Sequence, residues 1–339
     1  MENLESQTRS NPIINWLLTS TEPWTRYRTL RDLLERPEDD PQVSRARSDI
    51  LADPRVIGLL STSKGVENTP FKRHNDAGHP LFQLGVLADF GLSVADPSMA
   101  PLLHGLLSRQ SGQGAFQSLE LIPVAYGGSG QPDWAWMACD APVVLSILIQ
   151  CGLGADPRVQ KAAGHLADLS EENGWRCAVS PELGKFHGPG RRSDPCPIAN
   201  LLALRALSYM SGVADSAAVH NGIEMLLGHW EHRTENKYYL FGIGSDFQRI
   251  KYPLIWYDLL NATDVLSRFS LAREDPRFIE MLAALSKLGN QEGLFTASSI
   301  YQAWKGWSFN DKKNPSPWLT FLVHRILKRS GQNLSNFEH

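Results

Sequence analysis

The sequence lacks long uninterrupted runs of apolar residues, which argues against a membrane-spanning helix. Its most apolar stretch, from Ala141 to Gly154, is interrupted by Ser146 and Gln150 and is too short to cross a bilayer. The N-terminal residues up to Pro12 contain no apolar segment of the kind found in secretory signals. We therefore expect a protein that is not transmembrane and that resides in the cytoplasm.

The sequence also lacks a strong excess of either charge. It has 33 basic and 36 acidic residues, and its formal net charge is −3. Proteins that bind nucleic acid through their overall field are usually strongly basic, so we expect no nucleic-acid partner. The four cysteines, at positions 139, 151, 177 and 196, are expected to be reduced thiols in the cytoplasm.

Several familiar catalytic motifs are absent. The sequence has no Gly-x-Ser-x-Gly elbow and no phosphate-binding P-loop. The Gly-Gly-Ser-Gly segment at 127–130 precedes Trp134 without a strand signal, and we interpret it as a loop. Alternating apolar runs are scarce, which predicts little β-sheet.

What the sequence does contain is a repeated pattern of helix signals. Proline opens a series of apolar segments at intervals of about 60 residues, and proline suits the first turn of a helix. These prolines stand at positions 80, 142, 197, 253 and 317. A second, more charged segment follows the Asp-Pro pairs at 96–97, 156–157 and 275–276, where the aspartate can cap a helix. The pattern predicts an all-α fold of helix pairs, with apolar inner and charged outer helices.

The repeats define the expected organisation of the chain. We expect residues 1–70 to form a helical arm that completes or caps a ring. Residues 71–330 would carry the repeats, and residues 331–339 would form a polar tail. The alternative is an irregular helical bundle in which the proline, aspartate and glycine signals recur by chance. The recurrence of these three signals in phase argues against it.

Three repeats close in a similar way, with Gly-Trp or a glycine shortly before phenylalanine after a Gln- or acid-rich turn. The closing segments are 110–116, 171–175 and 291–295. This pattern resembles protein prenyltransferase β subunits and squalene or terpenoid cyclases over residues 78–329. The resemblance implies an α/α toroid of about five to six helix-pair repeats. It also implies an isoprenoid or other apolar substrate in a central cavity.

The sequence departs from the motifs of that superfamily. It has neither the Asp-x-Asp-Asp of class II cyclases nor the Asp-Asp-x-x-Asp of class I synthases. Asp194-Pro195-Cys196 matches the Asp-x-Cys zinc motif of prenyltransferases, but the histidine expected one repeat later is missing from 251–258. Transferase or cyclase chemistry therefore stays open. The alternative is a non-catalytic module that binds an apolar ligand or a partner chain.

The starts of the inner helices are the predicted site. If these helices are parallel, the residues before each one converge on one face, where helix N-termini favour anions. The predicted acids and bases are His74, Asp76, Asp140, Asp194 and Asp258. The predicted ligand contacts are Arg73, Trp136, Trp256, Tyr257 and Trp318. The alternative for each acid is that it only caps its helix.

The cysteines suggest a metal. Cys139, Cys177 and Cys196, with His187 or Asp194, would offer the thiolate, imidazole and carboxylate donors that zinc accepts. The alternative is a set of buried free thiols.

The segment 179–194 between these cysteines is a predicted lid or anion clamp, carrying Lys185, Arg191 and Arg192, or simply solvated packing over the ring. A deep empty cavity lined by Trp136 and Trp256 would favour an enzyme. A centre filled by the protein's own side chains would favour a binding module.

Overall fold

The computed structural model describes residues 11–186, 188, 191–210, 212–235 and 243–333. Within these ranges the chain is mostly helical, and its named strands form two short antiparallel pairs. The prediction of a predominantly helical protein is confirmed. In the described ranges, no helix combines the length and apolar character needed to cross a membrane.

Most of the α-helices in the described ranges fall into an inner and an outer set. The inner set comprises α3 (Pro23–Arg28), α6 (Pro80–Phe90), α8 (Ala141–Leu148), α10 (Pro197–Leu207), α12 (Leu259–Leu266) and α15 (Pro317–Arg329). The outer set comprises α4 (Pro41–Ala52), α5 (Pro54–Ser63), α7 (Ala100–Ser108), α9 (Pro157–Asp168), α11 (Ala217–Glu231) and α14 (Pro276–Ser286). Shorter elements include α2 (Pro12–Leu18), α13 (Ser270–Arg273) and the π-helical turns η1 (Thr29–Leu33) and η3 (Ile149–Leu153). The 3₁₀ turns are η2 (Val124–Tyr126), η4 (Pro181–Leu183), η5 (Gln302–Trp304) and η6 (Ser308–Asn310).

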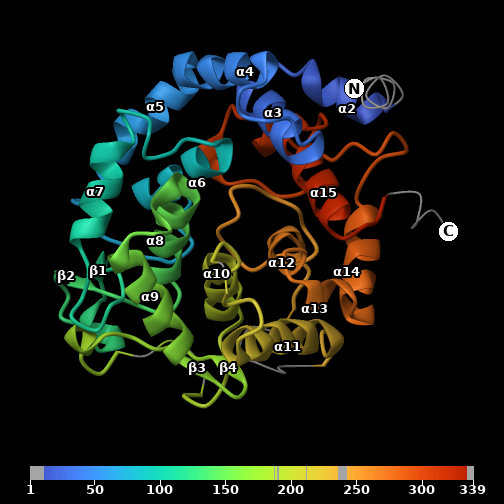
Figure 1. The fold of residues 1–339 in the computed structure, drawn as a ribbon. Coiled ribbons are helices and arrows are strands. Elements are labelled where there is room, and N and C mark those ends of the chain that lie inside the picture. The colour runs from blue at the N-terminus through green and yellow to red at the C-terminus, as the bar shows by residue number, and fades with distance from the viewer. Residues whose placement is uncertain (1–10, 187, 189–190, 211, 236–242, 334–339) are drawn as a thin grey trace.

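The inner helices contact one another in a closed order. α6 packs on α8, α8 on α10, α10 on α12, α12 on α15, α15 on α3, and α3 on α6. The outer helices pack against these helices from outside, as Figure 1 shows, with α5 on α6, α9 on α8 and α11 on α10. Because α3 lies between α6 and α15, the described part of the N-terminal region is continuous with the repeats.

The burial of each set explains its composition. Every residue of α10 is buried, including Asn200 and Arg205, which fits a helix that is apolar over most of its surface and packed on both sides. In α9 only one stripe is buried, made of Val159, Ala162, Ala163 and Leu166. That spacing places one face of α9 on the core and leaves its charged residues in solvent. Each buried aliphatic side chain contributes roughly 1.5–3 kcal/mol to the free energy of folding.

Most of the predicted helix starts are observed. Prolines occupy the first turn of α6, α8, α10 and α15, and Asp156 and Asp275 cap α9 and α14 through their side chains. The prediction for Pro253 was wrong. Residues 251–258 are not helical, and α12 begins at Leu259, where the Asp258 carboxylate accepts the Asn261 N–H at 2.9 Å.

The glycine-rich segment at 127–130 connects two strands that were not predicted. β1 (Ser118–Leu121) pairs antiparallel with β2 (Pro132–Ala135), and Trp134 lies within β2 opposite Leu119. A second pair joins β3 (Ser170–Glu171) to β4 (Gly174–Trp175). Strands this short carry too few residues to show a period of two in the sequence.

Candidate functional site

A cavity of about 460 Å³ lies at the N-terminal ends of inner helices. Its walls include His74 before α6, Cys139 before α8, Cys196 before α10 and Trp256 before α12. The segment after β4 contributes Cys177. Residues that stand far apart in the sequence meet here because each one immediately precedes an inner helix or follows a repeat.

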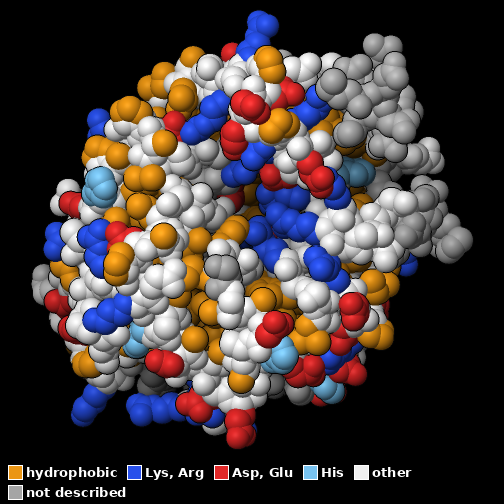
Figure 2. Space-filling view, viewed as in Figure 1, with side chains coloured by type: hydrophobic (Ala, Val, Ile, Leu, Met, Phe, Trp, Pro, Cys, Tyr) orange, Lys and Arg blue, Asp and Glu red, His pale blue; other side chains and the backbone are white. Residues whose placement is uncertain are grey.

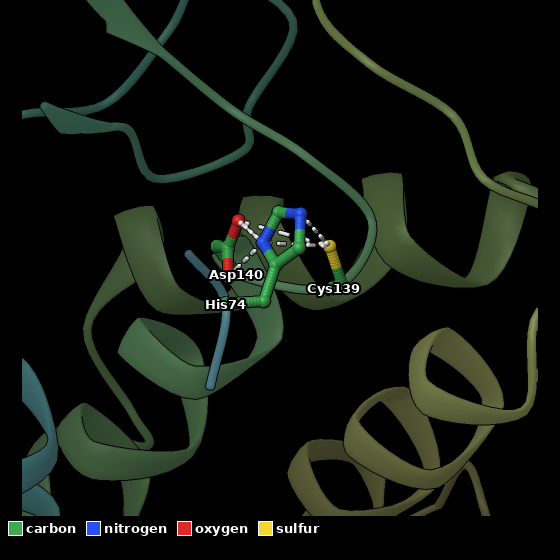
Figure 3. A group of neighbouring side chains, drawn as sticks. All are labelled: His74, Cys139 and Asp140. Atoms are coloured by element: carbon green, nitrogen blue, oxygen red, sulfur yellow. Dashed lines mark hydrogen bonds and ion pairs between the residues drawn. The ribbon is translucent and has the colours of Figure 1, made fainter. Parts of the chain in front are cut away.

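His74, Cys139 and Asp140 form a compact group beside this cavity (Figure 3). The His74 Nδ1 atom lies 2.9 Å from Asp140 Oδ2 and 3.2 Å from Asp140 Oδ1. The Cys139 Sγ atom lies 4.0 Å from His74 Nε2 and 3.7 Å from Asp140 Oδ2. Asp140 is buried, whereas the His74 side chain is 35% exposed at the cavity wall.

The carboxylate of Asp140 controls the charge of this group. It raises the pKa of His74 to about 9, so the imidazole is protonated at neutral pH in the metal-free protein. Glu120 on β1 is buried next to it, and burial followed by repulsion from Asp140 raises the pKa of Glu120 to about 8. Sequence analysis missed Glu120. The feature of the sequence that could have pointed to it is an acidic residue placed between two leucines.

The three cavity thiols lie close enough to affect one another electrostatically. Burial, and then the nearby charges of Asp140 and the other two thiols, raises the pKa of Cys139 far above its ordinary value. The pKa of Cys196 is raised to about 11, mainly by burial. Hydrogen bonds from the backbone oppose the effect of burial and favour the thiolate form. Cys177 accepts a backbone N–H from Gly188, and Cys196 accepts backbone N–H groups at the start of α10.

The cavity also carries basic and apolar groups. The segment 179–194 supplies Lys185, Arg191 and Arg192, and Arg176 lies beside it. Phe186 and Trp256 supply aromatic surface. The acidic lining residues are Asp168, Glu171 and Asp194, and Glu171 pairs with Arg176 at 3.8 Å. The segment is therefore a wall of the cavity, and His187 within it lies outside the described residues.

Not every predicted polar residue reaches this cavity. Asp194 lines it, and Asp140 contacts a lining residue. Asp76 is exposed and accepts the Gly78 N–H at 3.1 Å, and Arg73 is exposed too. Asp258 is buried away from the lining residues as the cap of α12, and burial raises its pKa to about 7.

Three of the predicted ligand-contacting aromatics do not line this cavity. Trp136 is buried, donates to Gln113 at 2.9 Å and packs edge-on against His165. Tyr257 stacks on His229. Trp318 is fully buried against Phe90 and Phe321. Large rings next to helix starts pack into the core because burial removes their apolar area from water.

Between α6, α8 and α10, the space inside the inner helices is filled by the chain itself. Residues 253–255 lie against α6, α8 and α10, and the cavity that remains among them measures about 30 Å³. Leu254 and Ile255 are buried, and the Leu254 carbonyl accepts from Arg205 at 3.4 Å. A ligand of ordinary size has no room there, so the cavity next to His74 is the candidate site.

Comparisons with known proteins give no family for this chain. No family model matches the sequence, and no curated protein matches it. Among solved structures, the chain is similar to a crystal structure of a protein from Actinoplanes, with 13% sequence identity and a TM-score of 0.42. The alignment covers 97% of this chain and 100% of that chain.

Proposed function

We propose that the chain is an α/α toroid that holds a zinc ion beside the cavity at the N-terminal ends of its inner helices. In the same cavity it binds an apolar ligand with an anionic group, such as an isoprenyl diphosphate. The closed order of contacts from α6 through α15 and α3 back to α6 supports the toroid. The rest of the proposal rests on His74 and Cys139, which form a compact group with Asp140, and on Cys177 and Cys196, which line the same cavity.

The orientation of His74 fits a zinc ligand. Asp140 binds its Nδ1 atom, so the Nε2 atom is left to face a metal, as in many carboxylate–histidine–zinc arrangements. Ordinary Zn–N and Zn–S bond lengths at a tetrahedral angle separate the two donor atoms by about 3.6 Å. The observed distance from Nε2 to Cys139 Sγ is 4.0 Å. Because this sulfur lies nearer to Nδ1, at 3.5 Å, a metal bound through Nε2 would require the sulfur and the ring to shift.

The thiols complete the donor set. Cys139, Cys177 and Cys196 with His74 make the Cys₃His combination that zinc prefers. The backbone N–H groups that contact Cys177 and Cys196 would hold these sulfurs as thiolates and orient them. Burial raises the pKa of each thiol. A bound divalent cation would offset that cost, and at neutral pH it would bind the deprotonated forms.

The cavity lining supports the ligand class. Its volume of about 460 Å³ lies within the usual range for small-molecule sites. Lys185, Arg191 and Arg192 suit an anionic head group, and Phe186 with Trp256 suits an apolar chain. The proposal concerns binding first, since Asp140 is engaged by His74 and Glu171 by Arg176.

A second candidate is a purely non-catalytic binding module. One observation and one consequence of the proposed zinc site favour it over a toroid enzyme with a central active site. The centre is filled by residues 253–255. A Cys₃His set would also occupy all four positions of tetrahedral zinc, as structural sites do. Incubation of the pure protein with farnesyl diphosphate, followed by mass spectrometry, separates the two candidates: a new product supports the enzyme, and unchanged ligand supports the module.

Metal analysis tests the zinc centre. Purified wild-type protein should contain about one equivalent of zinc, and Cys139→Ser and Cys196→Ser should lose it. Cys151→Ser is the matched control, because Cys151 is also a buried thiol but contacts the Leu92 carbonyl in a different region. Metal-free wild-type protein with undiminished thermal stability would contradict the proposal.

Tryptophan fluorescence tests the ligand. Farnesyl diphosphate should quench the emission of Trp256, and the Kd should rise at least about tenfold in Arg191→Gln, which removes one charge-assisted contact. Zinc content should not change in that variant. Equal affinity of wild type and variant would place the ligand elsewhere.

A further inference from the structure

The opposite ends of the inner helices form a second, strongly basic cavity. It measures about 610 Å³ and is lined where α3, α8, α10, α12 and α15 end. Its cationic lining residues are Arg28, Arg268, Arg325, Lys328 and Arg329. Figure 2 views the molecule from this side and shows Lys and Arg side chains gathered near the middle of the face, beside the hollow between α3, α12 and α15.

Three of these arginines converge on one buried carboxylate. Asp264 on α12 is 1% exposed, and its Oδ1 atom accepts from Arg325 and Arg329, each at 3.0 Å. Its Oδ2 atom accepts from Arg268 at 3.1 Å. The surrounding guanidinium groups hold the pKa of Asp264 far below its ordinary value, so this carboxylate carries a full negative charge.

Two of the cations donate hydrogen bonds to carbonyl groups at the C-terminal ends of helices. Lys328 donates to the Asp32 and Leu33 carbonyls at 3.2 and 2.8 Å. Arg28 donates to the Ala88 and Asp89 carbonyls at 3.0 and 2.7 Å. Cations at the C-terminal carbonyls of helices are ordinary capping partners. These two residues therefore need no ligand.

Helix capping does not account for Arg268, Arg325 and Arg329. Their hydrogen bonds within the described residues go to carboxylates, one each from Arg268 and Arg329 and two from Arg325, the second to Asp32 at 3.4 Å. The Nε atoms of Arg268 and Arg325 are buried with no hydrogen-bond partner in the same ranges. A guanidinium is rich in N–H donors, and the carboxylates of Asp264 and Asp32 cannot occupy those of three arginines.

The positive charge in the cavity exceeds the negative charge. Five cations line it, against the carboxylates of Asp32 and Glu35 in the lining and Asp264 beneath it. The surplus is visible at Arg329. Burial, and then repulsion from Arg268 and Arg325, lowers the pKa of Arg329 to about 9. An anion with more than one charge would relieve this repulsion and supply the missing acceptors.

We propose that the cavity formed by Arg268, Arg325 and Arg329 binds a phosphate or diphosphate group. The guanidinium group of an arginine can donate two parallel hydrogen bonds to two oxygens of one phosphate group. The volume admits such a group together with part of the molecule that carries it. The site is distinct from the cavity beside His74, because the two lie at opposite ends of the inner helices.

Calorimetry with inorganic pyrophosphate tests this site. Arg329→Gln should weaken binding at least about tenfold, as expected for one lost charge-assisted contact. This variant should fold, because Asp264 keeps Arg268 and Arg325 as partners. Arg329→Lys retains the charge without the fork and should show a smaller loss. Because Arg191 lines the other proposed anion site, Arg191→Gln distinguishes the two cavities, and binding that depends on Arg329 should persist in this variant.

A phosphate reaches such a cavity either on a soluble molecule or on a lipid headgroup. Flotation with phosphatidylcholine vesicles, with and without phosphatidic acid, separates these sources. Pyrophosphate binding that depends on Arg329 supports a soluble ligand, and Arg329-dependent flotation only with phosphatidic acid supports a headgroup. Wild-type protein that binds neither probe overturns the proposal. So does binding that survives in Arg329→Gln and disappears in Arg191→Gln, which would assign the anion to the cavity beside His74.

Discussion

Replacement of Asp258 by asparagine should change how the free energy of unfolding depends on pH. Asp258 caps α12 while it is 1% exposed, and its Oδ2 atom has no hydrogen-bond partner among the described residues. Burial raises the pKa of this carboxyl from 3.8 to about 7, although Lys251 and Arg205 oppose the shift. The folded protein thus keeps a proton that the unfolded chain releases.

The sign and size of the effect follow from that difference. A raised pKa contributes stability that is fully present below the unfolded value of 3.8 and is lost as pH rises through about 7. Between pH 5 and pH 7 the unfolded carboxyl is ionised and the folded one is protonated. Each rise of one pH unit in that window lowers the free energy of unfolding by about 1.4 kcal/mol. Wild-type protein should therefore lose about 3 kcal/mol through this group between pH 5 and pH 8.

Urea unfolding at pH 5 and pH 8 measures how much Asp258 contributes to the pH dependence of the free energy of unfolding. The asparagine side chain cannot ionise and still caps the helix, so the stability of Asp258→Asn relative to wild type should rise by about 3 kcal/mol from pH 5 to pH 8. Other titrating groups cancel in this comparison. If the amide group that replaces Oδ2 has a constant energetic cost, it lowers the free energy of unfolding by the same amount at both pH values.

Asp275→Asn provides the matched control. Asp275 also caps a helix, but its contact with Arg277 holds its pKa below the ordinary value. It is ionised in both folded and unfolded states between pH 5 and pH 8, so its variant should show no change across that range. If Asp258→Asn behaves in the same way, the carboxyl is ionised in the folded protein and the reasoning from burial is wrong.

Two further substitutions, one of them with a matched control variant, test the packing. Asp264→Asn should lower the free energy of unfolding by about 3–5 kcal/mol, because it leaves buried guanidinium groups without their counter-charge; a loss below about 1 kcal/mol in urea unfolding would contradict this. Gly174→Ala should cost more than about 2 kcal/mol, because φ is +92° and a Cβ would lie 2.2 Å from Asn200 Oδ1. Gly306→Ala, with φ +94° and no atom within 4 Å of a Cβ, should cost only about 1 kcal/mol, and equal melting temperatures for the two variants would remove the role assigned to the clash.

The sequence determined the helices and many of their ends. Asp156 and Asp275 cap α9 and α14, and Pro80 opens α6, because capping and proline geometry act within a few residues of the chain. The contrast between α10, buried on every side, and α9, buried on one stripe, also follows from the spacing of apolar residues. Pro253 failed as a helix start, since a proline suits a loop as well as a first turn.

The contents of the sites depended on tertiary structure. Packing of α6 beside α8 brings His74 to Asp140, 66 residues later, and no local signal specifies that contact. The same holds for Glu120, which reaches this group through a four-residue strand.

At the other end of the inner helices, Arg325 and Asp264 meet across 61 residues because α12 packs on α15. The sequence could place acids, thiols and arginines at the ends of helices. Which of them face one another is decided by how the helices pack, because long-range contacts depend on the positions of whole elements rather than on their neighbours in the chain.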